Sequence, residues 1–285
     1  MSDTAILLIS CPKERGVPSA LAEFVYHANG NILRLDEHVD AEHNLLLLRM
    51  EWSLEDFAID MREFARHFDP IAQRFNMRWR AEVSSYRPKV AIFVSRYDHC
   101  LADLLYRHRA GELPCEIPIV ICNHPDIVQW TDYYKIPLQF IPVTKENKAE
   151  AEKQQLELIE MLGIDLIVLA RYMQVLSADF LRHFPPYQII NIHHSFLPAF
   201  VGAKPHQQAY ERGVKLIGAT SHYATEVLDE GPIIEQDVVR VSHRDRPEDL
   251  IQKGRDIEKV VLARAVRWHL ENRVLLYGNK TAVFL

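Results

Sequence analysis

Apolar residues follow two different rhythms along the chain, and the rhythm changes near residue 88. Before that point, an apolar run over 4–10 predicts a strand, and apolar residues spaced by three and four over 21–28 predict an amphipathic helix. Strand-like segments over 32–39 and 45–52 follow. Helical spacing over 54–75, with Ser53 as N-cap, predicts a long helix before a last strand over 77–83. The order βαββαβ is typical of a ferredoxin-like sandwich.

Residues 84–88 are polar, contain a proline and are predicted to be a linker. Beyond them, strand-like and helical segments alternate, which indicates a parallel, doubly wound sheet. Longer strand-like segments over 216–223 and 233–241, a helix from Arg246 to about Glu271, and a hairpin around Gly278 complete the pattern. The predicted parallel strands are 90–94, 118–122, 138–141, 166–169 and 189–192.

Composition narrows the class of protein. The 285 residues are 48% hydrophobic and carry a net charge of −6, without a basic block, which argues against a nucleic-acid partner. No apolar run approaches the roughly 18 residues of a transmembrane helix, so no membrane partner is expected. The first residues carry no basic segment typical of a secretory signal, and the four cysteines show no paired spacing. We therefore expect reduced cysteines and a cytoplasmic protein.

Three polar residues lie where α/β proteins place their ligands. Asn191 and His193 end the predicted strand 189–192 and, being two residues apart, project from the same side of the sheet. Asp229 lies in the sequence Asp-Glu-Gly-Pro, after the strand over 216–223. Together these side chains suit attack on a small carbonyl without a covalent intermediate. Taken singly, His193 and Asp229 each have a structural alternative: a histidine can be satisfied at a strand end, and most aspartates in such turns bind only backbone N–H groups.

Several other site classes are not supported by the sequence. The histidine spacings fit neither His-Glu-x-x-His nor a Cys/His zinc pattern, so no metal site is expected. No Gly-x-Ser-x-Gly motif is present, and no cysteine has the context of a nucleophile. The first strand–helix connection of the second domain, Ser95–Cys100, contains no glycine. Because a loop that wraps a phosphate needs glycines for close approach, a dinucleotide or P-loop nucleotide is not expected there.

The motifs resemble those of a known family. Asn191-x-His193-x-Ser195-x-Leu197-Pro198, followed by Asp229-x-Gly231-Pro232, resembles the signature of formyltransferases that use 10-formyltetrahydrofolate. Three longer stretches are similar to the formyltetrahydrofolate deformylase family: 95–108 (SRYDHCLADLLYRH), 141–152 (IPVTKENKAEAE) and 202–220 (GAKPHQQAYERGVKLIGAT). The resemblance implies an α/β fold: an ACT domain over 1–83, a linker over 84–88, and over 89–285 a Rossmann-like formyltransferase domain with a mostly parallel sheet.

The resemblance also implies an activity: hydrolysis of 10-formyltetrahydrofolate to tetrahydrofolate and formate, which supplies formate and balances one-carbon pools for purine biosynthesis. It implies no cofactor, since the folate is the substrate, and it assigns Asn191, His193 and Asp229 as catalytic residues. Asn191 would donate to the formyl oxygen, protonated His193 could add a second donor, and Asp229 would move the proton of water toward N10. The implied folate contacts are Tyr172, Met173, Gln174, Val175, Leu176, His222, Ala224 and Thr225.

Two other functions remain open at this point. One is formyl transfer to a small amine such as glycinamide ribonucleotide, although the connection 95–100 lacks the glycine-bearing loop that would hold the phosphate of that substrate. The other is an ACT-based amino-acid sensor with an inactive folate domain. ACT domains often pair through their sheets, so a homo-oligomer is expected. Lys13 stands where the family commonly has an aspartate, which puts an amino-acid effector in question, and His206 stands where a tyrosine is expected.

Overall fold

The computed structural model describes residues 3–198 and 205–285, so residues 202–204 of the third resemblance motif lie outside the described part. The chain divides into two compact units. The first comprises residues 1–86 together with 271–285, and the second comprises 87–270. The C-terminal residues 271–285, which the sequence assigned to the catalytic domain, thus belong with the N-terminal unit.

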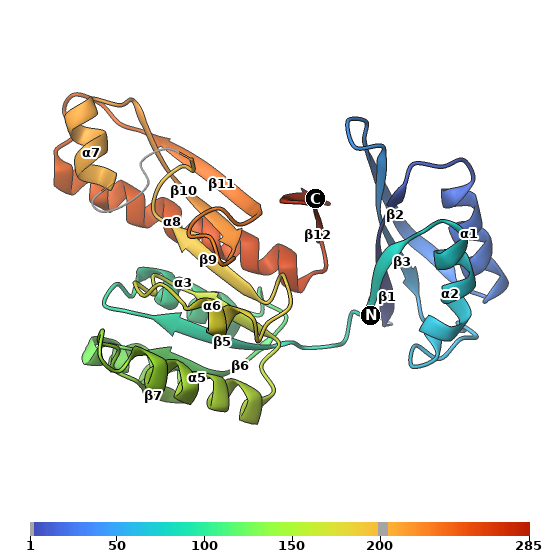
Figure 1. The fold of residues 1–285 in the computed structure, drawn as a ribbon, viewed down its shortest axis with the longest axis horizontal. Coiled ribbons are helices and arrows are strands. Elements are labelled where there is room, and N and C mark those ends of the chain that lie inside the picture. The colour runs from blue at the N-terminus through green and yellow to red at the C-terminus, as the bar shows by residue number, and fades with distance from the viewer. Residues whose placement is uncertain (1–2, 199–204) are drawn as a thin grey trace. The chain divides into compact units, whose positions relative to one another are not determined.

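The first unit is a four-stranded antiparallel sheet in the order β2-β3-β1-β4, with α1 and α2 on one face (Figure 1). This arrangement agrees with the predicted ferredoxin-like sandwich. Its elements are β1 (Thr4–Pro12), α1 (Val17–His27), β2 (Asn31–Asp40), β3 (Leu45–Ser53), α2 (Phe64–Arg74), β4 (Arg78–Val83), β12 (Val274–Tyr277) and β13 (Lys280–Val283).

The continuous apolar run of β1 reflects burial on both faces of this sheet. Leu7 and Ile9 pack against the helices, whereas Leu8, which points the other way, packs against Leu275 and Phe284 of the C-terminal segment. Arg49 Nε donates to the carbonyl of Asn272 at 3.0 Å, and Arg80 Nη1 donates to the Asn272 side chain at 2.9 Å. The hairpin β12–β13 therefore completes the core of the first unit.

The prediction of a long helix from Ser53 is wrong. Ser53 ends β3, residues 54–63 form turns, and α2 begins only at Phe64. Leu54, Phe57 and Met61 nevertheless pack against the same core as α2. Their spacing marked the residues that face the core, and a looped segment satisfies that requirement as well as a helix does.

The second unit is a seven-stranded sheet in the order β11-β10-β9-β8-β5-β6-β7. Strands β5 to β9 are parallel, and β10 is antiparallel to both of its neighbours, so the predicted mostly parallel sheet is confirmed. Its elements are β5 (Lys89–Val94), α3 (His99–Arg109), β6 (Glu116–Cys122), the 3-10 turn η1 (Pro125–Ile127), α4 (Val128–Tyr134), β7 (Leu138–Phe140), α5 (Lys148–Leu162), β8 (Leu166–Leu169), α6 (Ala178–Leu181), β9 (Ile189–His193), α7 (Pro205–Arg212), β10 (Leu216–Tyr223), β11 (Ile233–Arg240) and α8 (Pro247–Leu270).

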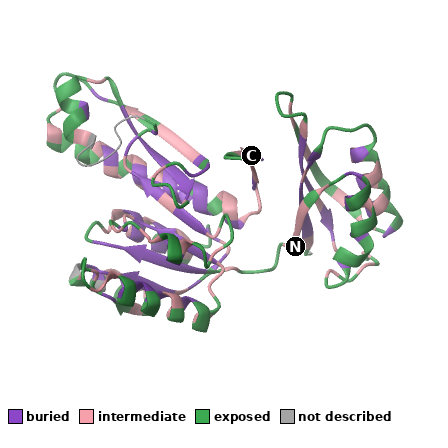
Figure 2. Ribbon diagram, viewed as in Figure 1, coloured by how far each residue is buried: buried purple, intermediate pink, exposed green. Residues whose placement is uncertain are grey.

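The strand order reverses at β5, since the chain runs from β5 out to β6 and β7 and then returns to β8 on the other side. Helix α5 packs on one face of the sheet, while α8 packs against β9, β10 and β11 (Figure 1). Figure 2 shows β9 and β10 as largely buried, β11 as mostly intermediate or exposed, and much of α5 and α7 as exposed. The loops at the carboxyl ends of β8 and β9 lie beside this reversal, where open α/β sheets bind ligands.

In the described part of the chain, no helix combines the length and the apolar character that crossing a bilayer requires. Cys11, Cys100, Cys115 and Cys122 are buried free thiols. Burial raises the pKa of the Cys115 thiol to about 12, which makes that thiol unreactive as a nucleophile.

Candidate active site

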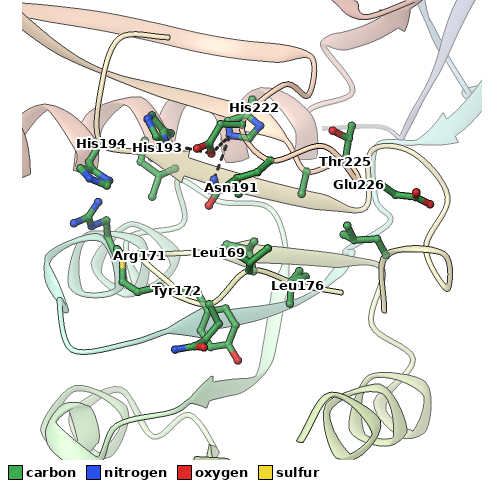
Figure 3. Close-up of a pocket in the computed structure, with 18 residues that line it drawn as sticks. Leu169, Arg171, Tyr172, Leu176, Asn191, His193, His194, His222, Thr225 and Glu226 are labelled. Atoms are coloured by element: carbon green, nitrogen blue, oxygen red, sulfur yellow. Dashed lines mark hydrogen bonds and ion pairs between the residues drawn. The ribbon is translucent and has the colours of Figure 1, made fainter. Parts of the chain in front are cut away.

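A cavity of about 440 Å³ opens at the carboxyl ends of β8 and β9 (Figure 3). The segment that follows β8 forms one wall, and the end of β9 together with the loop after β10 forms the other. The structure brings into this one cavity every residue predicted to belong to the site: Asn191, His193, Asp229, Tyr172, Met173, Gln174, Val175, Leu176, His222, Ala224 and Thr225.

The imidazole of His193 links the carboxylate to the strand end. Asp229 Oδ1 lies 3.2 Å from His193 Nδ1, and Ser195 Oγ lies 2.8 Å from His193 Nε2. Because a carboxylate only accepts, Nδ1 carries the proton and donates to Asp229. The ring is 6% exposed, so both of its nitrogens depend on these partners rather than on bulk water.

Asp229 occupies a left-handed backbone position with φ 58°, which aspartate tolerates better than most residues. Burial raises the pKa of its carboxyl, but the hydrogen bond from His193 and the proximity of the His222 ring more than offset burial, and the net pKa lies below its usual range. The carboxylate is therefore ionised across the neutral range. It can accept a proton only transiently, as in a transition state.

A second histidine orients the amide of Asn191. His222 Nδ1 lies 3.0 Å from the carbonyl oxygen of Tyr223, so this nitrogen carries a proton and donates. In the neutral ring, Nε2 is then an acceptor, and Asn191 Nδ2 donates to it at 3.2 Å. Since an amide nitrogen has two N–H groups, the second remains available to a ligand in the cavity.

The segment after β8, which forms one wall of the cavity, is held by a hydrogen bond to the loop between β5 and α3. The Ser95 hydroxyl accepts from the backbone N–H of Met173 at 3.0 Å. Met173 and Val175 are 51% and 56% exposed, so they present apolar surface to a flat ligand. Tyr172 instead points into the core, where its hydroxyl accepts from Gln155 Nε2 at 3.0 Å (Figure 3).

Arg171 and His194 also line the cavity, although neither was predicted to have a catalytic or binding role of its own. Arg171 begins the wall after β8, and His194 stacks on His193 with ring centroids 5.2 Å apart. Strand alternation gave no reason to place His194 beside His193, because adjacent residues of a strand point to opposite faces. The chain leaves the sheet at His193, and this change of direction returns His194 to the cavity.

Among the described residues, one group has spacing suited to a metal: His99, Cys100 and Glu258. His99 Nε2 already lies 2.8 Å from Glu258 Oε2, and Arg171 Nε lies 3.3 Å from the same oxygen. A guanidinium at this distance opposes the binding of a second cation. The group therefore fits a buried ion-pair network better than a metal centre.

Comparison with known proteins places the chain in a family. The formyl transferase family matches residues 88–266. A formyltetrahydrofolate deformylase from Synechocystis is 53% identical over 99% of this chain and 98% of its own length. The chain belongs to the formyltetrahydrofolate deformylase family. The Bacillus subtilis member is 48% identical over 99% of this chain and 94% of its own length. The resemblance found in the motifs is thereby confirmed.

Solved structures agree with this family. A deformylase structure from Pseudomonas syringae superposes with a TM-score of 0.96 and 46% identity, covering 100% of this chain and 95% of that one. A glycinamide ribonucleotide transformylase from Symbiobacterium toebii superposes with a TM-score of 0.65 and 28% identity, covering 70% of this chain and 94% of that one. The deformylase likeness thus spans both units, whereas the transformylase likeness covers a smaller share of the chain.

Proposed function

We propose that the chain hydrolyses 10-formyltetrahydrofolate to tetrahydrofolate and formate, with Asn191, His193 and Asp229 as its catalytic residues. The observation that supports these assignments is the meeting of an amide, an imidazole and an ionised carboxylate in one cavity that also has an apolar wall. The folate contacts are those named above except Tyr172, whose side chain points into the core; Met173, Val175 and Leu176 form the apolar wall, and Ala224 and Thr225 belong to the other wall.

Water attacks the formyl carbon in this scheme, and negative charge develops on the formyl oxygen. The free N–H of Asn191 donates to that oxygen, an interaction whose loss typically lowers the rate by about 10²–10³. His193 provides a second donor in its doubly protonated form, in which Nδ1 donates to Asp229 and Nε2 exchanges Ser195 for the formyl oxygen. Asp229 accepts a proton from the attacking water and passes it toward N10, whose bond to the formyl carbon then breaks. No step requires a cofactor or a metal.

The test is a formate-release assay on 10-formyltetrahydrofolate, run with and without glycinamide ribonucleotide. We expect equal formate release in both, with tetrahydrofolate as the other product. Formyl transfer that requires the added amine would refute hydrolysis. An Asn191→Ala variant that folds normally but loses about 10²–10³ in rate supports its role, and full activity in that variant would contradict it.

We further infer a physiological role, a location and an assembly. Release of formate supplies and balances one-carbon pools for purine biosynthesis, and the four buried thiols support a reducing, cytoplasmic compartment. Strands β2 and β4 are the two edges of the first sheet, which supports pairing of copies into a homo-oligomer. A cavity of about 600 Å³ lined by residues of α2 and β4, including Phe64 and Trp79, could hold an amino-acid effector.

A further inference from the structure

The guanidinium of Arg171 lies at one end of the active-site cavity. Figure 3 shows it facing the ring of His194, at the opposite end from Thr225 and Glu226. The Arg171 side chain is 10% exposed, so the charged group is nearly removed from bulk water. A charge buried to this degree normally requires hydrogen-bond partners.

The partners of Arg171 leave most of its donors unused. Its Nε lies 3.3 Å from Glu258 Oε2 but lacks hydrogen-bond geometry, and the ring of Tyr97 lies 5.4 Å from its Cζ. No residue in the described ranges accepts a hydrogen bond from the guanidinium. Because arginine offers five N–H groups in a planar fork, an acceptor from outside the chain could bind there.

The charges around this end of the cavity favour an anion. Glu258 is shared between Arg171 and His99, and the Arg255 guanidinium lies 5.2 Å from the ring of Tyr97. Burial and the charge of Arg171 lower the pKa of His194 to about 3, so His194 is a neutral ring that can donate one N–H. Glu258, the carboxylate that approaches Arg171, is thus shared with His99 and offsets only part of the positive charge of Arg171.

We propose that Arg171, together with His194, binds the carboxylate of formate as it leaves the catalytic centre. The inference rests on the proposed hydrolysis. The oxygen of water becomes the second oxygen of formate as the bond from carbon to N10 breaks; N10 takes one proton and solvent takes the other. Formate is then an anion with two acceptor oxygens, which matches the fork of Arg171. The stacking of His194 on His193 places this subsite beside the reacting carbon.

The carboxylates of the folate's glutamate tail are a second kind of anion that the guanidinium of Arg171 could bind. Leu176 and Thr225, two of the residues assigned to the folate body, lie toward the far end of the cavity from Arg171 (Figure 3). The catalytic residues lie between them and Arg171. A ligand that fills the folate end thus meets Arg171 beyond its formyl group, where the product forms.

Product inhibition tests the subsite. The rate of tetrahydrofolate formation is measured with added sodium formate at constant ionic strength, with chloride as the replacement anion. We expect formate to inhibit the wild-type protein and Arg171→Gln to weaken that inhibition at least about tenfold. Arg171→Lys keeps the charge beside Glu258 but loses the fork, so its inhibition should be weakened by a smaller factor. Arg255→Gln, which removes the guanidinium on the other side of Tyr97, should retain wild-type inhibition.

Three outcomes would refute the formate subsite while leaving hydrolysis intact. In the first, the wild-type protein releases formate yet is not inhibited by it. In the second, added formate inhibits wild type and Arg171→Gln equally. In the third, Arg255→Gln weakens inhibition by formate as much as Arg171→Gln does. A KM that rises in Arg171→Gln for the glutamyl substrate, but not for a 10-formyl pteroate lacking glutamate, would assign Arg171 to the folate tail and also refute the proposal. Failure of the wild-type protein to release formate would instead refute the proposed function. Thermal unfolding of each variant at neutral pH verifies its fold.

Discussion

The carboxylate of Asp229 lies 3.2 Å from Nδ1 of His193 and 3.7 Å from Nε2 of His222. The same oxygen atom, Oδ1, is the nearer one to both rings, so a single aspartate contacts two histidines on neighbouring strands. His193 comes from the end of β9 and His222 from β10, and the carboxylate completes a polar centre between them. Replacing this carboxylate should therefore lower the rate of turnover more than replacing any residue of the apolar wall.

Replacing Asp229 with asparagine should preserve the fold and abolish nearly all turnover. The amide keeps the size of the side chain but cannot accept a proton from water, and a positioned acid–base group contributes roughly 10²–10⁴ in rate. Steady-state rates and thermal unfolding of the variant test this. More than about a tenth of wild-type activity in Asp229→Asn would contradict the assignment of Asp229.

Replacing Ser195 with alanine should have little effect on turnover. Ser195 Oγ lies 2.8 Å from His193 Nε2, the nitrogen that must turn to the formyl oxygen in the proposed scheme. Loss of this hydroxyl removes a competitor of the substrate rather than a donor to it. We expect kcat/KM within about threefold of wild type, far from the loss of about 10²–10³ expected when an oxyanion donor is removed. A loss of that larger size would instead assign the hydroxyl of Ser195 to the reacting oxygen.

His194 should make the protein less stable in acid. Its ordinary pKa is 6.5 and its folded pKa is about 3, so between these values the unfolded chain binds a proton that the folded chain does not. Stability therefore falls as pH decreases through this window and is fully recovered above about pH 6.5. At about pH 5 the cost is on the order of 2 kcal/mol.

Denaturant unfolding across this pH range tests the contribution of His194. His194→Gln, which cannot titrate, should lose less stability than wild type on going from about pH 8 to about pH 5. Replacement of the exposed His27 by glutamine serves as the control. Parallel pH profiles of the wild type and His194→Gln would show that burial of His194 does not govern acid stability.

Gly231 should be indispensable to the position of Asp229. A Cβ at residue 231 would collide with the carbonyl oxygen of Tyr223, a backbone atom that cannot move aside cheaply. Gly231→Ala should therefore displace the turn over 229–232 and lower kcat/KM by more than about tenfold, because small misplacements of catalytic groups cost about that much or more. Gly213→Ala is the matched control, since its Cβ meets no atom within 4 Å and only backbone strain of about 1–2 kcal/mol at φ 65° is added. Equal activity of the two variants would contradict this account.

The C-terminal hairpin should stabilise the first unit. Phe284 is 8% exposed and packs with Leu8 and Leu47 of that sheet. Phe284→Ala should lower the free energy of opening at the amides of β1, measured by native-state hydrogen exchange, by about 3 kcal/mol. Leu285→Ala alters a side chain that is 68% exposed and should change little. An unchanged exchange rate at β1 in Phe284→Ala would mean that the hairpin is not part of this cooperative unit.

Local patterns in the sequence predicted the strands and the site motif because both depend on short-range signals. Apolar runs located β5 to β9, and spacing by two placed Asn191 and His193 on one side of β9. Periodicity could not show that residues 54–63 form turns, since core-facing residues recur with the same spacing in either conformation. Arg171 and Glu258 are 87 residues apart and meet only through the fold, so their pairing left no local signal.

The first unit is assembled from both ends of the described chain, and the second unit is inserted between them. A single truncation after residue 86 therefore leaves a sheet whose second apolar face, around Leu8 and Leu47, has lost its cover. A minimal version of the first unit would require joining residues 271–285 to residue 86 through a designed linker. Conversely, the second unit is joined to the first by two chain connections, one before β5 and one after α8, so neither unit can be separated from the other by a single cut.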